Sequence, residues 1–492
     1  MNKLVILDLG QGNLNQEIPV SLEIKDENYS TLARSIGKLP AALDLVNSYK
    51  LWQNNYRSLS GNRFLYLLNN RARVGGTTSI ESIKTIIKKI TEDEEKLTQK
   101  LNKWLKYSLF YPVYYKLLEQ LVKSDTVRIV IQTDNHQLRQ LPWHCWDFWD
   151  GFTKVEIALS LSAYEKIQKE IVLKSKIRIL AILGNSNGIN IKKDREFLEK
   201  LPDTEIAFLV EPDRPKLTEY LWDEEGWNII FFAGHSSSNP QGDRGKIYLN
   251  RKDSYNLKAF RFALKKAIER GTHLAIFNSC DGLGLARELA DLQIPQIIVM
   301  REPVPDIIAQ EFLKHFLSAY SKGKPLYLAV REARERLQGW EDTCPCAMWL
   351  PVLCQHPSET TLNWQDFLPK KVSRKNNIFL NLIENIAAEY GYLEYLPPKE
   401  GDLLLQTLNT ASEEELTPAE KEIFIVTVSY CSYFKRGFPV PFARYRFNSD
   451  ESYYKRAMSE IQLGKLASTY PALSSIVKDS TLSQILSLTE VQ

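Results

Sequence analysis

Two short apolar runs, each followed at once by a reactive side chain, constrain this sequence more than any other feature. Residues 228–233 lead directly into a Gly-His pair ending at His235, and residues 273–277 lead into Asn-Ser-Cys ending at Cys280. Neither run alternates with polar residues, which is typical of strands in a parallel sheet covered by helices on both faces. Because reactive groups of such sheets collect beyond the carboxyl ends of the strands, we expect the imidazole and the thiol to lie near each other.

The surrounding sequence repeats this alternation of strand and helix. Further strands are predicted at residues 177–183, 205–210 and 295–300, and helices at residues 192–200, 215–222, 257–270 and 283–292. Alternating β and α patterns with short connections predict an α/β sandwich with a mainly parallel sheet. Residues 245–250 suit an extra hairpin at the edge of that sheet.

Residues 1–170 predict an accessory α+β region. The predicted elements are a hairpin at residues 3–9 and 19–24, helices at 41–52 and 79–106, and strands at 126–133 and 155–161. Between the last two strands lies an aromatic block, residues 141–149, which includes His144 next to Cys145. Adjacent side chains point apart, so we interpret the block as packing and not as a catalytic pair.

Two further segments follow the alternating region. Residues 356–376 are polar and basic and predict a linker, and residues 377–492 have helical patterns with a capping box at Thr417 to Glu420. We therefore expect a small helical adaptor or regulatory domain at the end of the chain.

Composition limits the possible partners and the compartment. The net charge is only +3, from 63 basic and 60 acidic residues among 492, which does not favour nucleic acid. The first apolar run is interrupted by Asp8, and no run reaches the length of a membrane span. The six cysteines have no regular spacing, so we expect reduced thiols. Together with the short apolar runs, this leads us to expect a cytoplasmic protein that neither spans nor binds a membrane.

A group of possible zinc ligands lies near the end of the alternating region. Cys344, Cys346, Cys354 and His356 would complete a tetrahedral site. The alternative is that residues 348–353 form a buried strand in which cysteine is only a small hydrophobe. We favour the second interpretation and predict no metal and no cofactor.

The residue types at the two loops suit nucleophilic catalysis. Cys280 is the candidate nucleophile, and the helix predicted from Leu283 would lower the pKa of its thiol. His235 is the candidate base and acid, and Gly234 before it permits tight backbone geometry. The amide of Cys280 is a candidate donor to the oxyanion of the intermediate.

The residues at these two loops, 233–236 and 278–282, resemble the His and Cys motifs of CHAT-domain proteases, the caspase-like, separase-related peptidases of bacteria. The resemblance covers roughly residues 176–355. It continues through residues 284–287, 294–300, 304–306, 309–312, 329–334 and 349–352.

The resemblance implies a caspase-like α/β/α sandwich at 176–355 and a cysteine endopeptidase acting on a protein substrate in a regulated signalling or defence pathway. By likeness to caspases, the second oxyanion donor would be the amide after the histidine, where this sequence has Ser236 in place of glycine. Relatives that cut after basic residues place a carboxylate in the first substrate pocket, and the candidates here are Asp306, Glu302 and Asp281. Residues 1–170 would be an accessory half, in some relatives a degenerate copy of the protease.

Two other functions have to be weighed. A latent CHAT scaffold would keep the fold without catalysis and recruit a regulatory protein partner through the C-terminal helical domain; the presence of His235 and Cys280 favours the enzyme. A nucleotide-binding module is disfavoured, because residues 184–188 lack both the Rossmann glycine pattern and a phosphate-loop lysine.

Overall fold

The computed structural model describes residues 2–11, 14–59, 77–161, 175–185, 190–238, 245–279, 282–356 and 362–368. The chain divides into two compact units, Met1–Pro369 and Lys370–Gln492. The predicted helical domain at 377–492 and most of the predicted linker lie outside the described residues. The described fold is that of the first unit.

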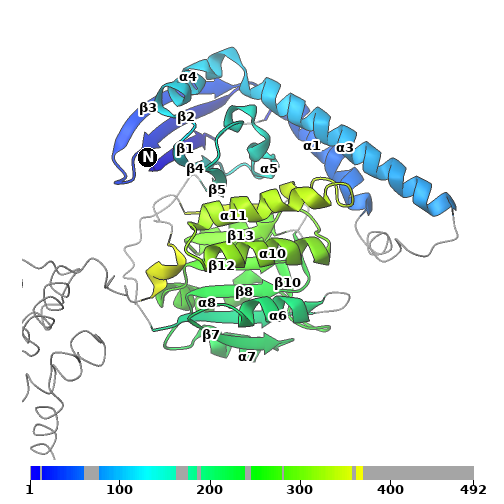
Figure 1. Cartoon of the computed structure of the whole chain (residues 1–492), viewed down its shortest axis with the longest axis vertical. Helices are drawn as coiled ribbons and strands as arrows, with labels where there is room; N and C mark the ends of the chain where they lie inside the picture. The colour runs from blue at the N-terminus through cyan, green and yellow to red at the C-terminus, as the bar shows by residue number, and fades with distance from the viewer. Residues whose placement is uncertain are drawn as a thin grey trace, which may run out of the picture. The chain divides into compact units, whose positions relative to one another are not determined.

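Most of the described strands of this unit form an 11-stranded sheet in the order β3-β2-β1-β4-β5-β14-β13-β12-β8-β6-β7 (Figure 1). Their bounds are β1 (Asn2–Leu9), β2 (Ile18–Lys25), β3 (Thr31–Leu39), β4 (Thr126–Gln132), β5 (Val155–Ser160), β6 (Ile177–Leu183), β7 (Thr204–Val210), β8 (Ile229–Ala233), β12 (Leu274–Asn278), β13 (Gln296–Met300) and β14 (Pro351–Gln355).

The five strands predicted for residues 176–355, which are β6, β7, β8, β12 and β13, form within one residue of the expected bounds and are parallel to one another. All residues of β6, β8, β12 and β13 are buried, as their unbroken apolar runs predict. The predicted α/β sandwich with a mainly parallel sheet is confirmed.

Helices cover both faces of these strands. They are α6 (Ile191–Glu199), α7 (Arg214–Leu221), α8 (Arg261–Glu269), α9 (Leu283–Asp291), α10 (Asp306–Tyr320) and α11 (Leu326–Glu335). Helices α6, α10 and α11 pack beside one another, as do α7 and α8. Right-handed crossovers place α6, α10 and α11 on one face of the sheet and α7, α8 and α9 on the other.

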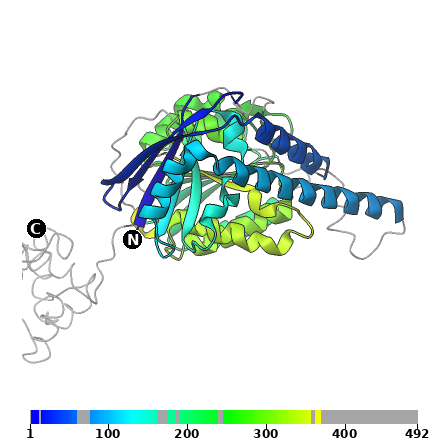
Figure 2. The same ribbon diagram turned by 90° about the horizontal axis from the view of Figure 1, so that it is seen from above.

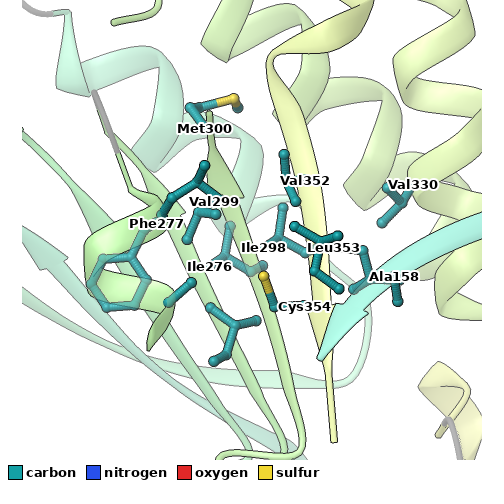
Figure 3. Close-up of a cluster of buried hydrophobic side chains, with 14 of the residues drawn as sticks. Ala158, Ile276, Phe277, Ile298, Val299, Met300, Val330, Val352, Leu353 and Cys354 are labelled. Atoms are coloured by element: carbon teal, nitrogen blue, oxygen red, sulfur yellow. The ribbon is translucent and has the colours of Figure 1, made fainter. Parts of the chain in front are cut away.

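The sheet reverses direction where β14 pairs antiparallel with β13. Strand β14 is parallel to β5, which is parallel to β4 and through it to β1. The sheet is therefore continuous from the accessory region into the predicted protease domain, and β1, β4, β5 and β14 run opposite to the five parallel strands. Figure 3 shows this junction, where Ala158 of β5, Leu353 of β14 and Ile298 of β13 lie in one apolar cluster with Val330 of α11.

The segment predicted as an edge hairpin belongs to a separate small sheet. Strand β10 (Gly245–Tyr248) pairs antiparallel with β9 (Ser236–Ser238) and with β11 (Ser254–Asn256). This places β9, which begins immediately after His235, outside the main sheet.

The accessory region contains the predicted hairpin and helices, a short helix α5 (His136–Gln140), and two longer elements that the sequence did not indicate. Helix α1 (Leu43–Leu59) lies along α3 (Thr77–Leu105), which extends beyond the rest of the unit in both views (Figures 1 and 2). The unexpected elements are the edge strand β3 and helix α4 (Tyr111–Gln120), which packs on it. The aromatic block forms two short 3-10 turns with Trp143 and Trp146 buried, which agrees with its interpretation as packing.

The first unit extends beyond the predicted protease boundary at 355. Trp364 and Phe367 are each 1% exposed, and the Tyr320 hydroxyl of α10 donates a 2.8 Å hydrogen bond to the carbonyl of Leu362. Trp364 packs edge-on against Tyr320 of α10, and Phe367 packs edge-on against the His273 ring.

We therefore predict that residues 1–369 fold alone and that a chain ending at 355 is less stable by at least about 3 kcal/mol, because it loses two buried aromatic side chains. Urea unfolding of the two chains measures the difference. Trp364→Ala in residues 1–369 is the matched control and should lose a similar amount. Equal unfolding midpoints for the chains ending at 355 and 369 would contradict the boundary at 369.

Candidate active site

The two motif loops leave adjacent strands at the same edge of the sheet. Strands β8 and β12 are parallel neighbours, and the last residue of each, Ala233 and Asn278, stand opposite each other. The residues that follow, Gly234 and Ser279, therefore begin their loops side by side. Cys280 and Asp281 lie outside the described residues, so the position of the candidate nucleophile is known only through its neighbours.

Gly234 occupies a backbone position that requires glycine. Its φ is +155°, and a Cβ atom there would lie 3.2 Å from the Cα of Gly184 and 3.2 Å from the Phe232 ring. The Gly184 amide donates to the Ala233 carbonyl at 2.8 Å, so the loop after β6 is held against the end of β8. This close approach turns the chain so that His235 stands at the sheet edge, half-buried.

A buried hydrogen bond joins the two loops. The hydroxyl of Ser236 donates to the hydroxyl of Ser279 over 2.8 Å, and both side chains are buried, at 7% and 3% exposed. Ser236 directly follows His235, and Ser279 directly precedes Cys280. The contact therefore fixes the His and Cys motifs relative to each other.

The Cys loop is also fixed on its other side. The Gly282 amide donates to the carbonyl of Met300, at the end of β13, over 2.7 Å. A Cβ atom on Gly282 would lie 2.7 Å from the Cβ of Val299, so only glycine permits this approach. Helix α9 begins at Leu283, as the sequence predicts, three residues after Cys280.

Two carboxylates lie beside the end of β12. Asp194 of α6 is 1% exposed and accepts a 3.1 Å hydrogen bond from the Asn278 side-chain amide. Burial raises the pKa of Asp194 to about 7, and the negative charge of Asp306 adds to the rise. An uncharged Asp194 is therefore substantially populated near neutral pH.

Asp306 accepts hydrogen bonds from the loop before α6 and from Gln310 of its own helix, but it does not cap that helix. Its Oδ2 accepts from the backbone amide of Asn190 at 3.0 Å and from Gln310 Nε2 at 2.9 Å, whereas the N-cap of α10 is Pro305 without a side-chain bond. Burial raises the pKa of Asp306, and the Asn190 amide opposes the rise. Asp306 lies near Asp194 at the edge where the His and Cys loops leave.

Glu302, the second carboxylate implied by the resemblance, is bonded to the accessory region. Its side chain is 0% exposed, and it accepts hydrogen bonds from Tyr49 Oη at 2.9 Å and from Arg57 Nε at 2.6 Å, both of α1. Asp281, the third candidate, is outside the described residues.

Sequence reasoning missed Asp194, Asn278 and Ser279 as parts of this site. Asn278 and Ser279 stand in the Cys motif, and their position after a buried strand was a usable signal. Asp194 gave no such signal in the sequence, because it lies among Lys192, Lys193 and Arg195, a pattern typical of a solvent-exposed helix face.

The adjacent pair His144 and Cys145 is chemically unsuited to catalysis. Burial raises the pKa of the Cys145 thiol to about 12, and burial together with Arg334 holds the pKa of His144 well below its usual range. The thiol therefore stays protonated and the imidazole neutral.

The cysteines weighed as zinc ligands make protein contacts. Cys346 accepts a 3.2 Å hydrogen bond from the Trp52 indole, and burial raises the pKa of Cys344 to about 12. Within the described ranges, no three His, Cys, Asp or Glu side chains gather in a way that would hold a metal ion.

Fold and site together define an α/β sandwich whose neighbouring parallel strands carry a His and a Cys motif. The sequence also matches the family described as CHAT domain over residues 99–369, more than half of the chain. The chain therefore belongs to the CHAT-domain family. The match begins within α3, so it includes part of the accessory region.

Other comparisons add less. No curated protein matches the chain. Among solved structures, the complex of the Porphyromonas gingivalis RgpB pro- and mature domains is similar with a TM-score of 0.34 and 10% sequence identity, over 65% of this chain and 77% of that chain. In the part of the chain that the structure describes, no helix is long and apolar enough to cross a membrane.

The raised pKa of Asp194 gives a pH-dependent stability. The folded state holds the proton up to a pH of about 7, whereas an unfolded aspartate releases it near pH 4, so stability falls as pH rises between these values. We predict that Asp194→Asn, which keeps the acceptor for Asn278, gains about 2–4 kcal/mol relative to wild type between pH 4.5 and pH 8. Urea unfolding of residues 1–369 at both pH values tests this, and parallel pH dependence of the two proteins would contradict it.

Proposed function

We propose that this chain is a cysteine endopeptidase that hydrolyses peptide bonds in a protein substrate with Cys280 as nucleophile and His235 as general base. The observation that carries the proposal is the Ser236 to Ser279 hydrogen bond, which holds the residue after His235 against the residue before Cys280. Membership of the CHAT-domain family supports the same chemistry.

The proposed reaction has two stages. His235 takes the thiol proton, and the Cys280 thiolate attacks the carbonyl carbon to give a tetrahedral oxyanion. Collapse of the oxyanion breaks the peptide C–N bond, the imidazolium gives its proton to the leaving amine, and a thioester remains. Water, deprotonated by His235, then attacks the thioester and releases the acid and the free thiol.

Two features of the backbone suit this reaction. The start of α9 at Leu283 offers the positive end of a helix dipole near the thiolate, which lowers its pKa. The oxyanion would be bound by the amides of Cys280 and Ser236. The carbonyl of His235 accepts from the Tyr248 amide of β10 at 3.0 Å, and alternation along an antiparallel pair favours a Ser236 amide directed away from β10.

A basic preference in the first substrate pocket is the finer part of the proposal. Asp306 and the neighbouring Asp194 place two carboxyl groups at the edge where the His and Cys loops leave their strands. Burial and the charge of Asp306 raise the pKa of Asp194, and a guanidinium or ammonium group of a substrate would oppose this rise.

The regulatory part of the proposal depends on sequence alone. We propose that residues 377–492 recruit a protein partner that controls the peptidase, in a signalling or defence pathway of the cytoplasm. Trapping with peptidyl electrophiles that differ in their first-pocket residue, followed by mass spectrometry of the labelled cysteine, tests the nucleophile and the preference together.

We predict that Cys280→Ala and His235→Ala each abolish proteolysis and that the double variant is no worse than either single one, because the two residues act as a unit. Peptide hydrolysis by the three variants measures this. Ser58→Ala, an exposed serine on α1, is the control and should retain wild-type rates. Full activity in folded Cys280→Ala would refute the assignment.

We predict that Asp306→Asn weakens cleavage after Arg and Lys by roughly a hundredfold or more, because the buried charge of the substrate loses its partner. Cleavage of a matched peptide with an apolar residue at this position should change little. The comparison of kcat/KM on the paired peptides separates this from instability, which lowers both rates together. Equal losses on both peptides would exclude the pocket role of Asp306.

A further inference from the structure

A buried polar cluster joins the accessory helix α1 to the residues that follow β13. Its centre is the carboxylate of Glu302, which is 0% exposed. Oε1 accepts from Tyr49 Oη at 2.9 Å and from Gln53 Nε2, and Oε2 accepts from Arg57 Nε at 2.6 Å. Three side chains that lie four residues apart on one face of α1 therefore donate to a single carboxylate.

The donors of this cluster suit a charged carboxylate. Burial, together with the charge of Glu302, raises the pKa of Tyr49 well above its usual range, so its hydroxyl stays protonated and donates. Arg57 carries a fixed positive charge and its side chain is 41% exposed, so the ion pair stands between the core and the surface of α1.

Neighbouring residues hold the same segment. The Tyr56 hydroxyl of α1 donates to the carbonyl of Pro303 over 3.0 Å. Arg301 donates from its backbone amide to the Leu350 carbonyl at 2.7 Å and from Nε to the Trp349 carbonyl at 3.0 Å. Residues 301–303 are thus fixed between α1 and the start of β14.

This segment continues directly from the residue that holds the Cys loop. The carbonyl of Met300 accepts the Gly282 amide, two residues after Cys280, and Val299 is in close contact with the Gly282 backbone. Any movement of residues 301–303 away from α1 would shift the end of β13 and with it the anchor of the Cys loop.

We propose that Glu302 is a positioning residue for the Cys280 loop and that Arg57 and Tyr49 of α1 are its partners, so that the accessory helix sets the placement of the nucleophile. The catalytic meaning of this role rests on the proposed function, whereas the mechanical link from α1 to Gly282 does not. A substrate cation would have to displace Arg57 to reach Glu302, so the role differs from the pocket contact that the resemblance implied.

The link is tested by amide hydrogen exchange of the full-length chain, read by mass spectrometry on peptides that contain Gly282. Glu302→Gln keeps the shape of the side chain but removes the charge that pairs with Arg57. Asp223→Asn is the matched control, because Asp223 pairs with Arg178 at 2.7 Å at the amino end of β6, on the opposite edge of the sheet.

We expect the Gly282 amide to exchange about tenfold faster or more in Glu302→Gln, because the anchor opens locally, and at the wild-type rate in Asp223→Asn. Arg57→Gln, on the surface of α1, should act in the same direction even if Glu302→Gln does not fold. In Arg57→Lys, which keeps the positive charge, the Gly282 amide should exchange at close to the wild-type rate. Unchanged exchange at Gly282 in both Glu302→Gln and Arg57→Gln would overturn the proposal.

Kinetics separate positioning from substrate contact. A positioning role predicts that Glu302→Gln lowers kcat roughly a hundredfold with the ratio of Arg to apolar cleavage unchanged, since a displaced nucleophile affects every substrate alike. A selective loss of Arg cleavage would overturn it in favour of a pocket role. If the wild-type chain cleaves no peptide but Gly282 exchange responds as expected, the positioning link stands and the proposed function fails.

Discussion

The parallel pairing of β8 with β12 is the constraint on which the rest of the site depends. The alignment of Ala233 with Asn278 decides that the two loops start level with each other. A shift of one residue would turn each following side chain to the other face of the sheet. The serine pair that joins the loops requires this alignment, and the contact of Gly282 with β13 requires the corresponding alignment of β12 with β13.

The central strands and their helices could be predicted because their physical signal is local. An apolar run with no polar alternation is buried on both faces wherever it lies, so β8 and β12 were recognisable from the sequence alone. The candidate residues His235 and Cys280 were found in the same way, from their position at the ends of these runs. Their roles stay predictions, because Cys280 lies outside the described residues.

The missing parts depend on partners that are distant in the chain. Glu302 meets Arg57 from 245 residues away, and Asp194 meets Asn278 from 84 residues away. No window of sequence around Asp194 distinguishes it from the solvent-exposed charges beside it, because its burial is set by packing of α6 against α10. The edge strand β3 was missed because its residues are largely exposed and lack a buried face.

The buried carboxylates of this unit show two responses to a low-dielectric environment. Glu302 has a guanidinium within hydrogen-bonding distance, which favours its charged form. Asp194 instead faces a second carboxylate, which favours its neutral form. The two groups lie close to the same sheet edge, and of the two the pKa of Asp194 lies near neutral pH.

The antiparallel pairing of β14 with β13 also determines which edge of β14 the accessory strands cover. Only Leu353 and Cys354 of β14 pair with β5, at Ala158 and Leu159, and the buried ion pair of Arg334 with Glu156 reinforces this short seam. Without the accessory half, the flat apolar edge of β14 would be open to pairing with another chain. The accessory strands thus cover this edge, so that β14 has a strand partner on each side.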